Sequence, residues 1–576
     1  MIAVVAAALV VFSAAACGRS REELLFLELD ATERSLLASG TAKVESLDAA
    51  AAVADKVVTF GPEPYRILEV GPAASGTRAR YLVLLRNQSE IALTDAWFTV
   101  LDHRPAPRSP TGWALVDGRY LFVCGELSAT IRLYAISDTG LRPMWDLELA
   151  GVATIRDLAF VPEANALFLV DDFDSRLLRV TLPPGWRQAA AAPEEYVLDE
   201  VPLGHGAIEV RHLPGHLAIN LLLDHTLLIV PLADGAPDLA GAARIVHDGP
   251  IWSFATLPLG DSMLVAVGGV EDRPLDRTHG EFGYVDSFLF LYRLPLAEGA
   301  GGTVAAGDAG PPVRPRDGGR PSAAGPERIA ALNLSALGIV TPKAMRFEHG
   351  ARQVRGGGGG GGYLWVTGFG AERMARLRLS TAGIEVVATY PAPAGITDFL
   401  LNGGPGSESN GAPESEGNGR RESIGRGTPQ SEADGMPRSL VATSTLIDRI
   451  CSIDLTGSGT RAGKPASTDL TEASARWSYT PLLLASETGP RPEPGAATGQ
   501  PIDVRLGEAL FFTTLMSPHN RTEGELSRFT CETCHFEGAI DGRTHFTGRD
   551  NVYATTKPLR GLANNVPLFS RAGDAS

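Results

Sequence analysis

The sequence predicts a mainly β protein: a β-propeller of six or seven blades, followed by a small α-helical domain. Three observations lead to this fold class. Short apolar runs alternate with turn residues through most of the chain, and one strand pattern recurs at a blade-sized spacing. Near residue 503 the pattern changes to apolar residues at helical spacing, which marks a second domain.

The recurring pattern lies within residues 55–456 and consists of short strands rich in Val, Leu, Ile, Phe and Tyr. In its clearest copy, runs at 155–160, 166–170 and 176–180 are separated by polar turns. The copies repeat at roughly 42–54 residues, the length of a propeller blade. A pair of β-sandwiches is the alternative. The repetition favours the propeller, in which a radial arrangement leaves only short, protected sheet edges.

Three segments interrupt the strand pattern. Residues 299–327 are rich in Gly, Pro and Ala, residues 356–362 are seven consecutive glycines, and residues 402–438 are mostly Gly, Ser, Glu and Asn. Such segments bury too little apolar surface to offset the entropy lost on ordering, so we expect disordered insertions in the propeller. Residues 457–502, rich in Thr, Ser, Pro and Gly, are expected to form a linker.

The N-terminus has the pattern of an export signal. An apolar run from Ile2 to Ala16 is shorter than the ~20 residues of a transmembrane helix and ends in small residues before Cys17. This arrangement resembles the bacterial lipoprotein signal. We therefore expect residues 1–17 to be that signal, Cys17 to be lipidated, and residues 18–54 to form a tether. The expected location is the periplasm or the outer membrane, with a lipid anchor in the membrane; a plainly cleaved signal is the alternative.

Charge and cysteine content exclude two classes of protein. The net charge of −16 argues against a nucleic-acid partner, because phosphate binding needs a basic surface. Five cysteines in 576 residues are too few for a disulfide scaffold. Two of them, Cys124 and Cys451, lie in or beside predicted strands and either form a disulfide or are buried thiols.

Residues 531–535 read Cys-Glu-Thr-Cys-His, the attachment motif for a c-type haem. Two thiols three residues apart on a helical turn share a face, so Cys531 and Cys534 can both form thioethers with the haem vinyl groups. The imidazole of His535 then lies under the iron as proximal ligand. A zinc site would need a second Cys or His pair, and a thioredoxin-like pair would need a βαβ setting. We expect one covalent haem c.

The residues around this motif add a family resemblance. Arg505-Leu506-Gly507-Glu508-Ala509-Leu510-Phe511-Phe512 and Leu515-Met516-Ser517 precede the motif, and Lys557–Leu562 and Pro567–Phe569 follow it. Together they resemble the bacterial di-heme cytochrome c peroxidase family. The resemblance covers about residues 501–576. It implies that residues 503–576 correspond to part of the N-terminal haem domain of that family, a small helical cytochrome c domain fused behind the propeller.

The resemblance also implies electron transfer, with peroxide as the acceptor. A redox partner protein or a small-molecule electron acceptor is the expected partner. The family's second haem motif is absent from this chain, so we expect a truncated domain, and peroxidase activity stays open. For the sixth iron ligand, His545 best matches the family's distal His; a solvent-exposed loop residue is the alternative. Met516 and His519 are weaker candidates. The alternative function is a cell-surface binding module in which the haem is a sensor or docking contact.

Overall fold

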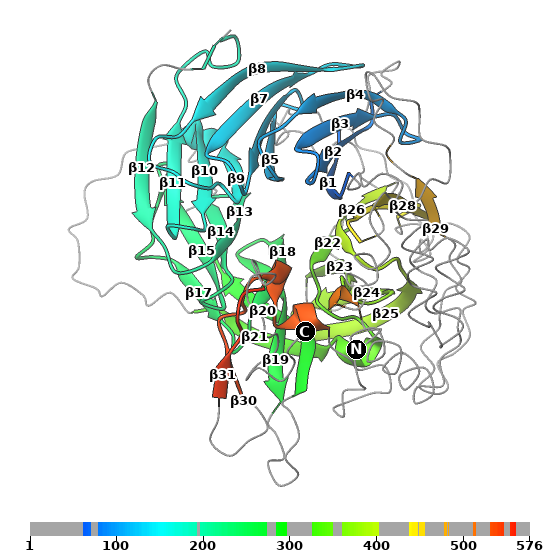
Figure 1. Cartoon of the computed structure of the whole chain (residues 1–576). Helices are drawn as coiled ribbons and strands as arrows, with labels where there is room; N and C mark the ends of the chain where they lie inside the picture. The colour runs from blue at the N-terminus through cyan, green and yellow to red at the C-terminus, as the bar shows by residue number, and fades with distance from the viewer. Residues whose placement is uncertain are drawn as a thin grey trace, which may run out of the picture.

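The computed structural model describes residues 62–70, 79–189, 191–192, 196–273, 284–296, 325–348, 360–402, 437–446, 448–455, 477–480, 482, 511–513, 530–546 and 553–559. These residues form a seven-bladed β-propeller, seen along its axis in Figure 1. Each blade is an antiparallel sheet of four strands, except that the fourth blade has five. The count lies within the predicted six or seven, and the paired sandwiches are excluded.

Each blade is built from consecutive strands, with the first strand innermost. Blade 1 contains β1 (Pro64–Glu69), β2 (Tyr81–Leu85), β3 (Glu90–Thr94) and β4 (Val100–Pro105). Blade 2 contains β5 (Pro110–Val116), β6 (Tyr120–Gly125), β7 (Thr130–Ile136) and β8 (Leu141–Glu148). Blade 3 contains β9 (Asp157–Val161), β10 (Ala166–Asp171), β11 (Arg176–Thr181) and β12 (Val197–Pro202). Blade 4 contains β13 (Ala207–Leu213), β14 (His216–Leu221), β15 (Thr226–Ala233), β16 (Ala236–Pro237) and β17 (Ala243–Val246). Blade 5 contains β18 (Ile251–Leu259), β19 (Ser262–Arg273), β20 (Tyr284–Pro295) and β21 (Glu327–Asn333). Blade 6 contains β22 (Ala344–Phe347), β23 (Gly361–Thr367), β24 (Arg373–Ser380) and β25 (Gly383–Pro391). Blade 7 contains β26 (Ile396–Asn402), β27 (Ser439–Ser444), β28 (Arg449–Asp454) and β29 (Trp477–Thr480). Short 3-10 helices are η2 (Pro162–Ala164), η4 (Ser335–Leu337), η6 (Cys531–Thr533) and η7 (Phe536–Gly538), and a final ribbon pairs β30 (Thr544–Phe546) with β31 (Tyr553–Thr555).

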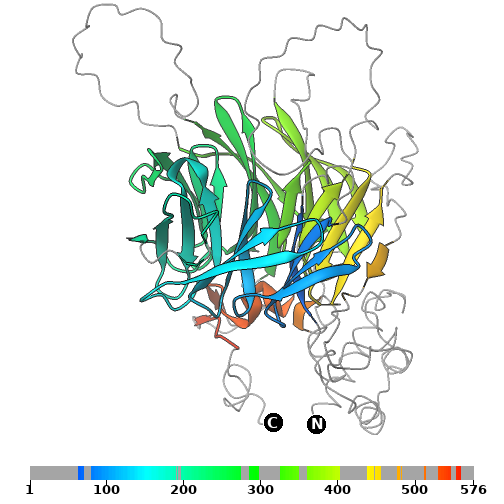
Figure 2. The same ribbon diagram turned by 90° about the horizontal axis from the view of Figure 1, so that it is seen from above.

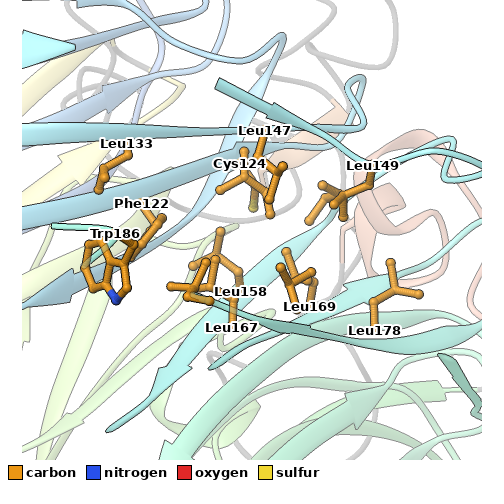
Figure 3. Packing of buried hydrophobic residues seen from close by; sticks show 14 of the residues in the cluster. Phe122, Cys124, Leu133, Leu147, Leu149, Leu158, Leu167, Leu169, Leu178 and Trp186 are labelled. Carbon is orange, nitrogen blue, oxygen red and sulfur yellow. The ribbon is translucent and has the colours of Figure 1, made fainter. Parts of the chain in front are cut away.

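The hydrophobic core lies between neighbouring blades. The middle strands of a blade are covered on both faces, so they read as unbroken apolar runs such as Ala166–Val170, every residue of which is fully buried. Figure 3 shows the cluster between blades 2 and 3, where Phe122 packs 5.0 Å from the ring of Trp186. The indole N–H of Trp186 donates to Asn165 (3.0 Å). Burying one such side chain stabilises the fold by about 1.5–3 kcal/mol.

The ring closes by packing rather than by a shared strand, because blades 1 and 7 each contain only their own consecutive strands. The backbone N–H of Ile67 in β1 donates to Asp398 in β26 (3.2 Å), and the Thr397 hydroxyl donates to the Tyr65 carbonyl (2.6 Å). The side chain of Ile67 lies in the same buried cluster as blade-7 residues. Contacts between residues more than 300 positions apart in the sequence therefore close the ring of blades.

Four predicted boundaries are wrong, two of them by more than one residue. Residues 477–480, expected in the linker, are β29, the outer strand of blade 7, where Trp477 pairs with Ile453. An outer edge strand is short and half-exposed, so its composition is like that of a linker. Gly361 and Gly362, expected in an insertion, begin β23 and pair with Ser380 and Leu379. A Cβ on Gly361 would lie 2.2 Å from the Leu379 carbonyl oxygen, so the close approach of the two strands requires glycine there.

Glu327 and Asn402, at the ends of the other two expected insertions, likewise belong to β21 and β26. The remainder of the three insertions lies mostly outside the described residues, as do the signal at 1–17, with Cys17, and the tether at 18–54.

The C-terminal segment lies on one face of the disc, as Figure 2 shows. Within 503–576 the described residues form η6, η7 and the β30–β31 ribbon, with helical backbone at Phe511 and Phe512. The small helical domain is therefore not seen in this described part. One physical reason is local: Glu537, Gly538 and Gly542 have left-handed backbone conformations (φ 46°, 75° and 73°), which interrupt a right-handed helix.

Candidate functional site

The predicted haem motif forms a single helical turn that is tied together at its start. The Thr530 hydroxyl accepts a hydrogen bond from the backbone N–H of Thr533 (3.2 Å), and the Thr533 hydroxyl accepts one from the N–H of Thr530 (3.0 Å). This reciprocal pair is a capping box. The Cys531 carbonyl oxygen accepts from the N–H groups of Cys534 (3.2 Å) and His535 (3.1 Å). The backbone therefore brings both thiols and the imidazole onto one turn.

The side chains of this turn divide between the propeller and the solvent. Glu532 is fully buried and Phe536 is 7% exposed, and both contact propeller residues. Cys531 is exposed, while Cys534 and His535 are half-buried. The turn thus binds the propeller through residues inside and after the motif. Of the predicted haem-binding groups, Cys531 is exposed, whereas Cys534 packs in part against the apolar cluster around Phe536.

Glu537 connects the turn to three blades. Its carboxylate lies 2.6 Å from a guanidinium nitrogen of Arg156, 3.5 Å from one of Arg86, and 3.6 Å from the ammonium of Lys343. Arg86 follows β2 in blade 1, Arg156 precedes β9 in blade 3, and Lys343 precedes β22 in blade 6. The left-handed backbone of Glu537 costs about 1 kcal/mol or more and persists only where surrounding contacts fix it. The three cations supply that fixation.

Lys343 is the centre of a second set of contacts. Its ammonium donates to Glu532 (2.6 Å) and lies 4.0 Å from the ring centroid of Phe369 and 5.1 Å from that of Phe536. The Phe536 ring in turn packs against Trp252, with 4.8 Å between centroids. Charge, aromatic faces and apolar packing therefore act together on the residues that flank His535.

Burial and charge drive the pKa values of the two buried glutamates apart. Burial raises the pKa of Glu532 from 4.5 to about 6, although the ammonium of Lys343 opposes the change. Burial acts on Glu537 in the same direction, but Arg156, Lys343 and Arg86 outweigh it and hold the pKa of Glu537 well below its usual range. Glu537 is thus a permanent carboxylate, whereas Glu532 changes charge near pH 6.

Asp541, Gly542 and Arg543 make a further contact, with blade 4. The Nε2–H of His225, in the β14–β15 turn, donates to the Asp541 carbonyl oxygen (2.6 Å). The Asp541 carboxylate accepts from the backbone N–H (3.1 Å) and the Nε–H (3.0 Å) of Arg543. A Cβ on Gly542 would lie 2.6 Å from the Leu223 carbonyl oxygen. The backbone of residues 541–543 therefore lies directly against blade 4, with no room for a side chain at position 542.

Phe536 and Glu537 also line an axial channel of about 600 Å³. The rest of its wall comes mainly from the innermost strands of all seven blades. Cations and carboxylates alternate along it: Arg66 lies 3.0 Å from Asp157, and Arg346 lies 3.0 Å from Asp398. Phe536 and Glu537, which follow the predicted haem motif, therefore form part of the wall of this polar cavity.

The donor set fits a covalently attached haem. Cys531 and Cys534 lie three residues apart on one turn, and the propeller covers other side chains of that turn. Although the Cys531 side chain is exposed, the protein atoms around it and the nearby Cys534 raise the pKa of its thiol. The ring of Phe511 lies 6.2 Å from the His535 imidazole and provides an apolar neighbour.

The structure describes some of the other predicted site residues and not others. His545 belongs to β30 and pairs with Ala554, but its side chain lies outside the described residues, as do Met516 and His519. Cys124 and Cys451 are buried in separate clusters, in blades 2 and 7, and do not form a disulfide. Within the described ranges, no group of three or more His, Cys, Asp or Glu side chains could hold a metal ion. Nor is any helix there long and apolar enough to cross a bilayer.

Sequence reasoning missed the residues that anchor the motif. Arg156, Trp252 and Lys343 share one position in the repeat, at or just before the first strand of their blades, where side chains meet around the axis. Nothing local in the sequence singles out Glu537.

No family model matches the sequence, and no curated protein matches it. Similar solved structures include hydrazine synthase of Kuenenia stuttgartiensis (12% identity, TM-score 0.42, 69% of this chain and 97% of that chain). Others are the periplasmic gluconolactonase PpgL of Pseudomonas aeruginosa (12%, 0.38, 57% and 85%) and the dihydro-heme d1 dehydrogenase NirN (12%, 0.38, 84% and 82%). At such identities the likeness concerns the fold alone.

Proposed function

We propose that this chain is an exported c-type cytochrome in which one covalent haem, held on the face of a propeller, transfers electrons. Cys531 and Cys534 tether the haem and His535 is the proximal iron ligand. The observation that supports this most strongly is the division of the turn. Cys531 is exposed and Cys534 and His535 are half-buried, while Glu532, Phe536 and Glu537 bind the propeller.

Each residue then has a distinct role. When bound, the haem supplies a one-electron redox centre. The two thioethers would fix its position along the turn, and the capping box of Thr530 and Thr533 fixes the backbone that carries both cysteines. Glu537 and Phe536 prevent the turn from rotating away from the disc. A fixed orientation favours electron transfer because a partner meets the same haem edge at each encounter.

The membrane and compartment are part of the proposal. The apolar run before Cys17 supports export, and lipidation of Cys17 would hold the protein at the membrane, where a redox partner protein or a small-molecule electron acceptor is met. Peroxide is the acceptor we propose first, from the resemblance of residues 501–576 to the bacterial di-heme cytochrome c peroxidases.

Turnover with peroxide tests this function. The haem-loaded full chain is mixed with a reduced electron donor, and donor oxidation is followed with and without peroxide. We expect peroxide-dependent oxidation that is lost in His535→Ala. If the haem cycles between redox states without turning over peroxide, the electron-transfer proposal stands and the peroxidase proposal is contradicted.

A second function, ligand binding by the propeller, is favoured by the axial channel of about 600 Å³, whose walls offer both cationic and anionic groups. Arg66→Ala and Asp398→Ala should abolish binding of any small polar ligand found by calorimetry without changing the haem spectrum. Binding that survives both substitutions would exclude the channel as the site.

A further inference from the structure

Three side chains of blades 4 and 5, two of them buried, form a hydrogen-bonded row. Nε2 of His247, which follows β17, lies 3.1 Å from the hydroxyl of Tyr292 in β20. Nδ1 of His247 lies 3.4 Å from a carboxylate oxygen of Glu271 in β19. The His247 side chain is 3% exposed and that of Glu271 is 24% exposed. The row therefore runs from a buried phenol, through a buried imidazole, to a carboxylate that reaches solvent.

One tautomer of His247 satisfies both hydrogen bonds. If Nδ1 carries the ring hydrogen, it donates to the Glu271 carboxylate, and Nε2 accepts from the Tyr292 hydroxyl. The imidazole also packs 4.3 Å from the ring of Phe290, which holds its orientation. Burial raises the pKa of Tyr292 to about 12, with the guanidinium of Arg328 opposing the shift and Glu271 adding to it. The Tyr292 phenol therefore keeps its proton at neutral pH.

The backbone of His247 is linked to Asp541, which lies six residues after His535. The backbone N–H of His247 donates to the His225 carbonyl oxygen (3.0 Å), and the His225 side chain donates to the carbonyl oxygen of Asp541 (2.6 Å). Two hydrogen bonds therefore lead from His247 to the segment that follows His535.

We propose that Tyr292 is a redox-active tyrosine whose oxidation is coupled to proton transfer to His247. Tyr292 gives one electron to a one-electron oxidant, and its hydroxyl proton moves to Nε2 of His247. The products are a neutral phenoxyl radical and an imidazolium beside the Glu271 carboxylate. A returning electron, together with the same proton, restores the phenol. In the cell a haem held by Cys531, Cys534 and His535 would supply the one-electron oxidant, and this last step rests on the proposed function.

The His247 imidazole makes the site suitable for tyrosine oxidation because it can accept the phenol proton. Oxidation without proton transfer would leave an uncompensated positive charge on a buried ring, which is costly in a low-dielectric interior. Here the positive charge forms on an imidazole that is already paired with a carboxylate. Tyr134 provides the contrast, because its buried hydroxyl donates to the Pro105 carbonyl oxygen, which is not a base.

The experiment uses the full chain without haem, so its result does not depend on haem attachment. A photogenerated ruthenium(III) tris-bipyridine oxidises the protein, and electron paramagnetic resonance and transient absorption record tyrosyl radicals. We expect a neutral radical that is lost in Tyr292→Phe and kept in Tyr134→Phe. His247→Gln keeps a hydrogen-bonding group but no proton acceptor, and should slow radical formation by on the order of 10²-fold.

A measurement on the unaltered chain guards against misfolded variants. Radical formation should slow in D₂O, because the transferred proton is exchangeable. An unchanged signal in Tyr292→Phe, an unchanged rate in folded His247→Gln, or the absence of a solvent isotope effect would overturn the proposal.

Discussion

Arg156 and Glu537 form a buried ion pair of 2.6 Å although 381 residues separate them in the sequence. Arg156 immediately precedes β9, and Glu537 follows His535 by two residues. Their side chains are only 7% and 11% exposed. This pair fixes the position of the haem motif relative to the axis of the disc.

Glu537→Ala should therefore weaken the contact of residues 530–543 with the propeller. The substitution removes the carboxylate that Arg156, Arg86 and Lys343 share. Each cation keeps another acidic partner (Glu126, Glu63 and Glu532), so we expect a cost below the about 3–5 kcal/mol of leaving a buried charge unpaired. We expect amide hydrogen exchange of residues 530–543 to accelerate while the blade strands keep their protection. Glu385→Ala is the matched control, because Glu385 is 57% exposed in its pair with Arg378 and should cost about 1 kcal/mol or less. Equal effects of the two substitutions would contradict the anchoring role.

Two glycines separate backbone strain from lack of space. Gly538 and Gly542 both have positive φ (75° and 73°), but a Cβ on Gly538 meets nothing within 4 Å, whereas one on Gly542 meets the Leu223 carbonyl oxygen at 2.6 Å. Gly538→Ala should cost about 1 kcal/mol from strain alone. Gly542→Ala should cost clearly more, because the segment must move off blade 4. Thermal unfolding and hydrogen exchange measure the difference; a Gly538→Ala variant as unstable as Gly542→Ala would show that close approach is unimportant.

Docking of the segment should weaken as the pH rises from 4.5 through about 6. Glu532 binds its proton more tightly in the folded chain, so its contribution is fully present below 4.5 and is lost as the pH passes its raised pKa. The shift corresponds to about 2 kcal/mol. Lys343 and Glu537 face this carboxyl. Glu537 has a lowered pKa, so its own contribution is complete above 4.5 and constant across this window.

Hydrogen exchange of residues 530–543, compared between pH 5 and pH 7 after correction for intrinsic rates, checks this dependence. Glu532→Gln cannot titrate and should remove most of it. A pH dependence that is the same in Glu532→Gln would assign the effect to another group.

The propeller could be predicted because its strands carry their own signal. Leu167 and Leu169 lie in a continuous apolar run, which is what burial on both faces of a middle strand requires. The edge strand at Trp477–Thr480 could not be found this way, since an outer strand buries little and is short. The glycines at 361 and 362 were misassigned because composition does not reveal how close a neighbouring backbone lies.

The candidate site was only half predictable. The spacing of Cys531, Cys534 and His535 is local chemistry, so the motif could be read directly from the sequence. The anchoring of the turn is not local: Lys343 meets Glu532 from 189 residues away, and Arg156 meets Glu537 only because seven inner strands converge on one axis. Such contacts follow from the closure of the ring, which no short stretch of sequence encodes.

The most direct test of the account is whether the chain carries a covalent haem. The full chain is exported in a host that has cytochrome c maturation machinery, and its absorption spectrum is recorded oxidised and dithionite-reduced, beside Cys531→Ala. We expect a c-type α-band from haem that stays attached through denaturing electrophoresis, with attachment weakened or lost in the variant. A folded chain that carries no covalent haem would contradict the account and leave a propeller closed on one face by a turn of another function.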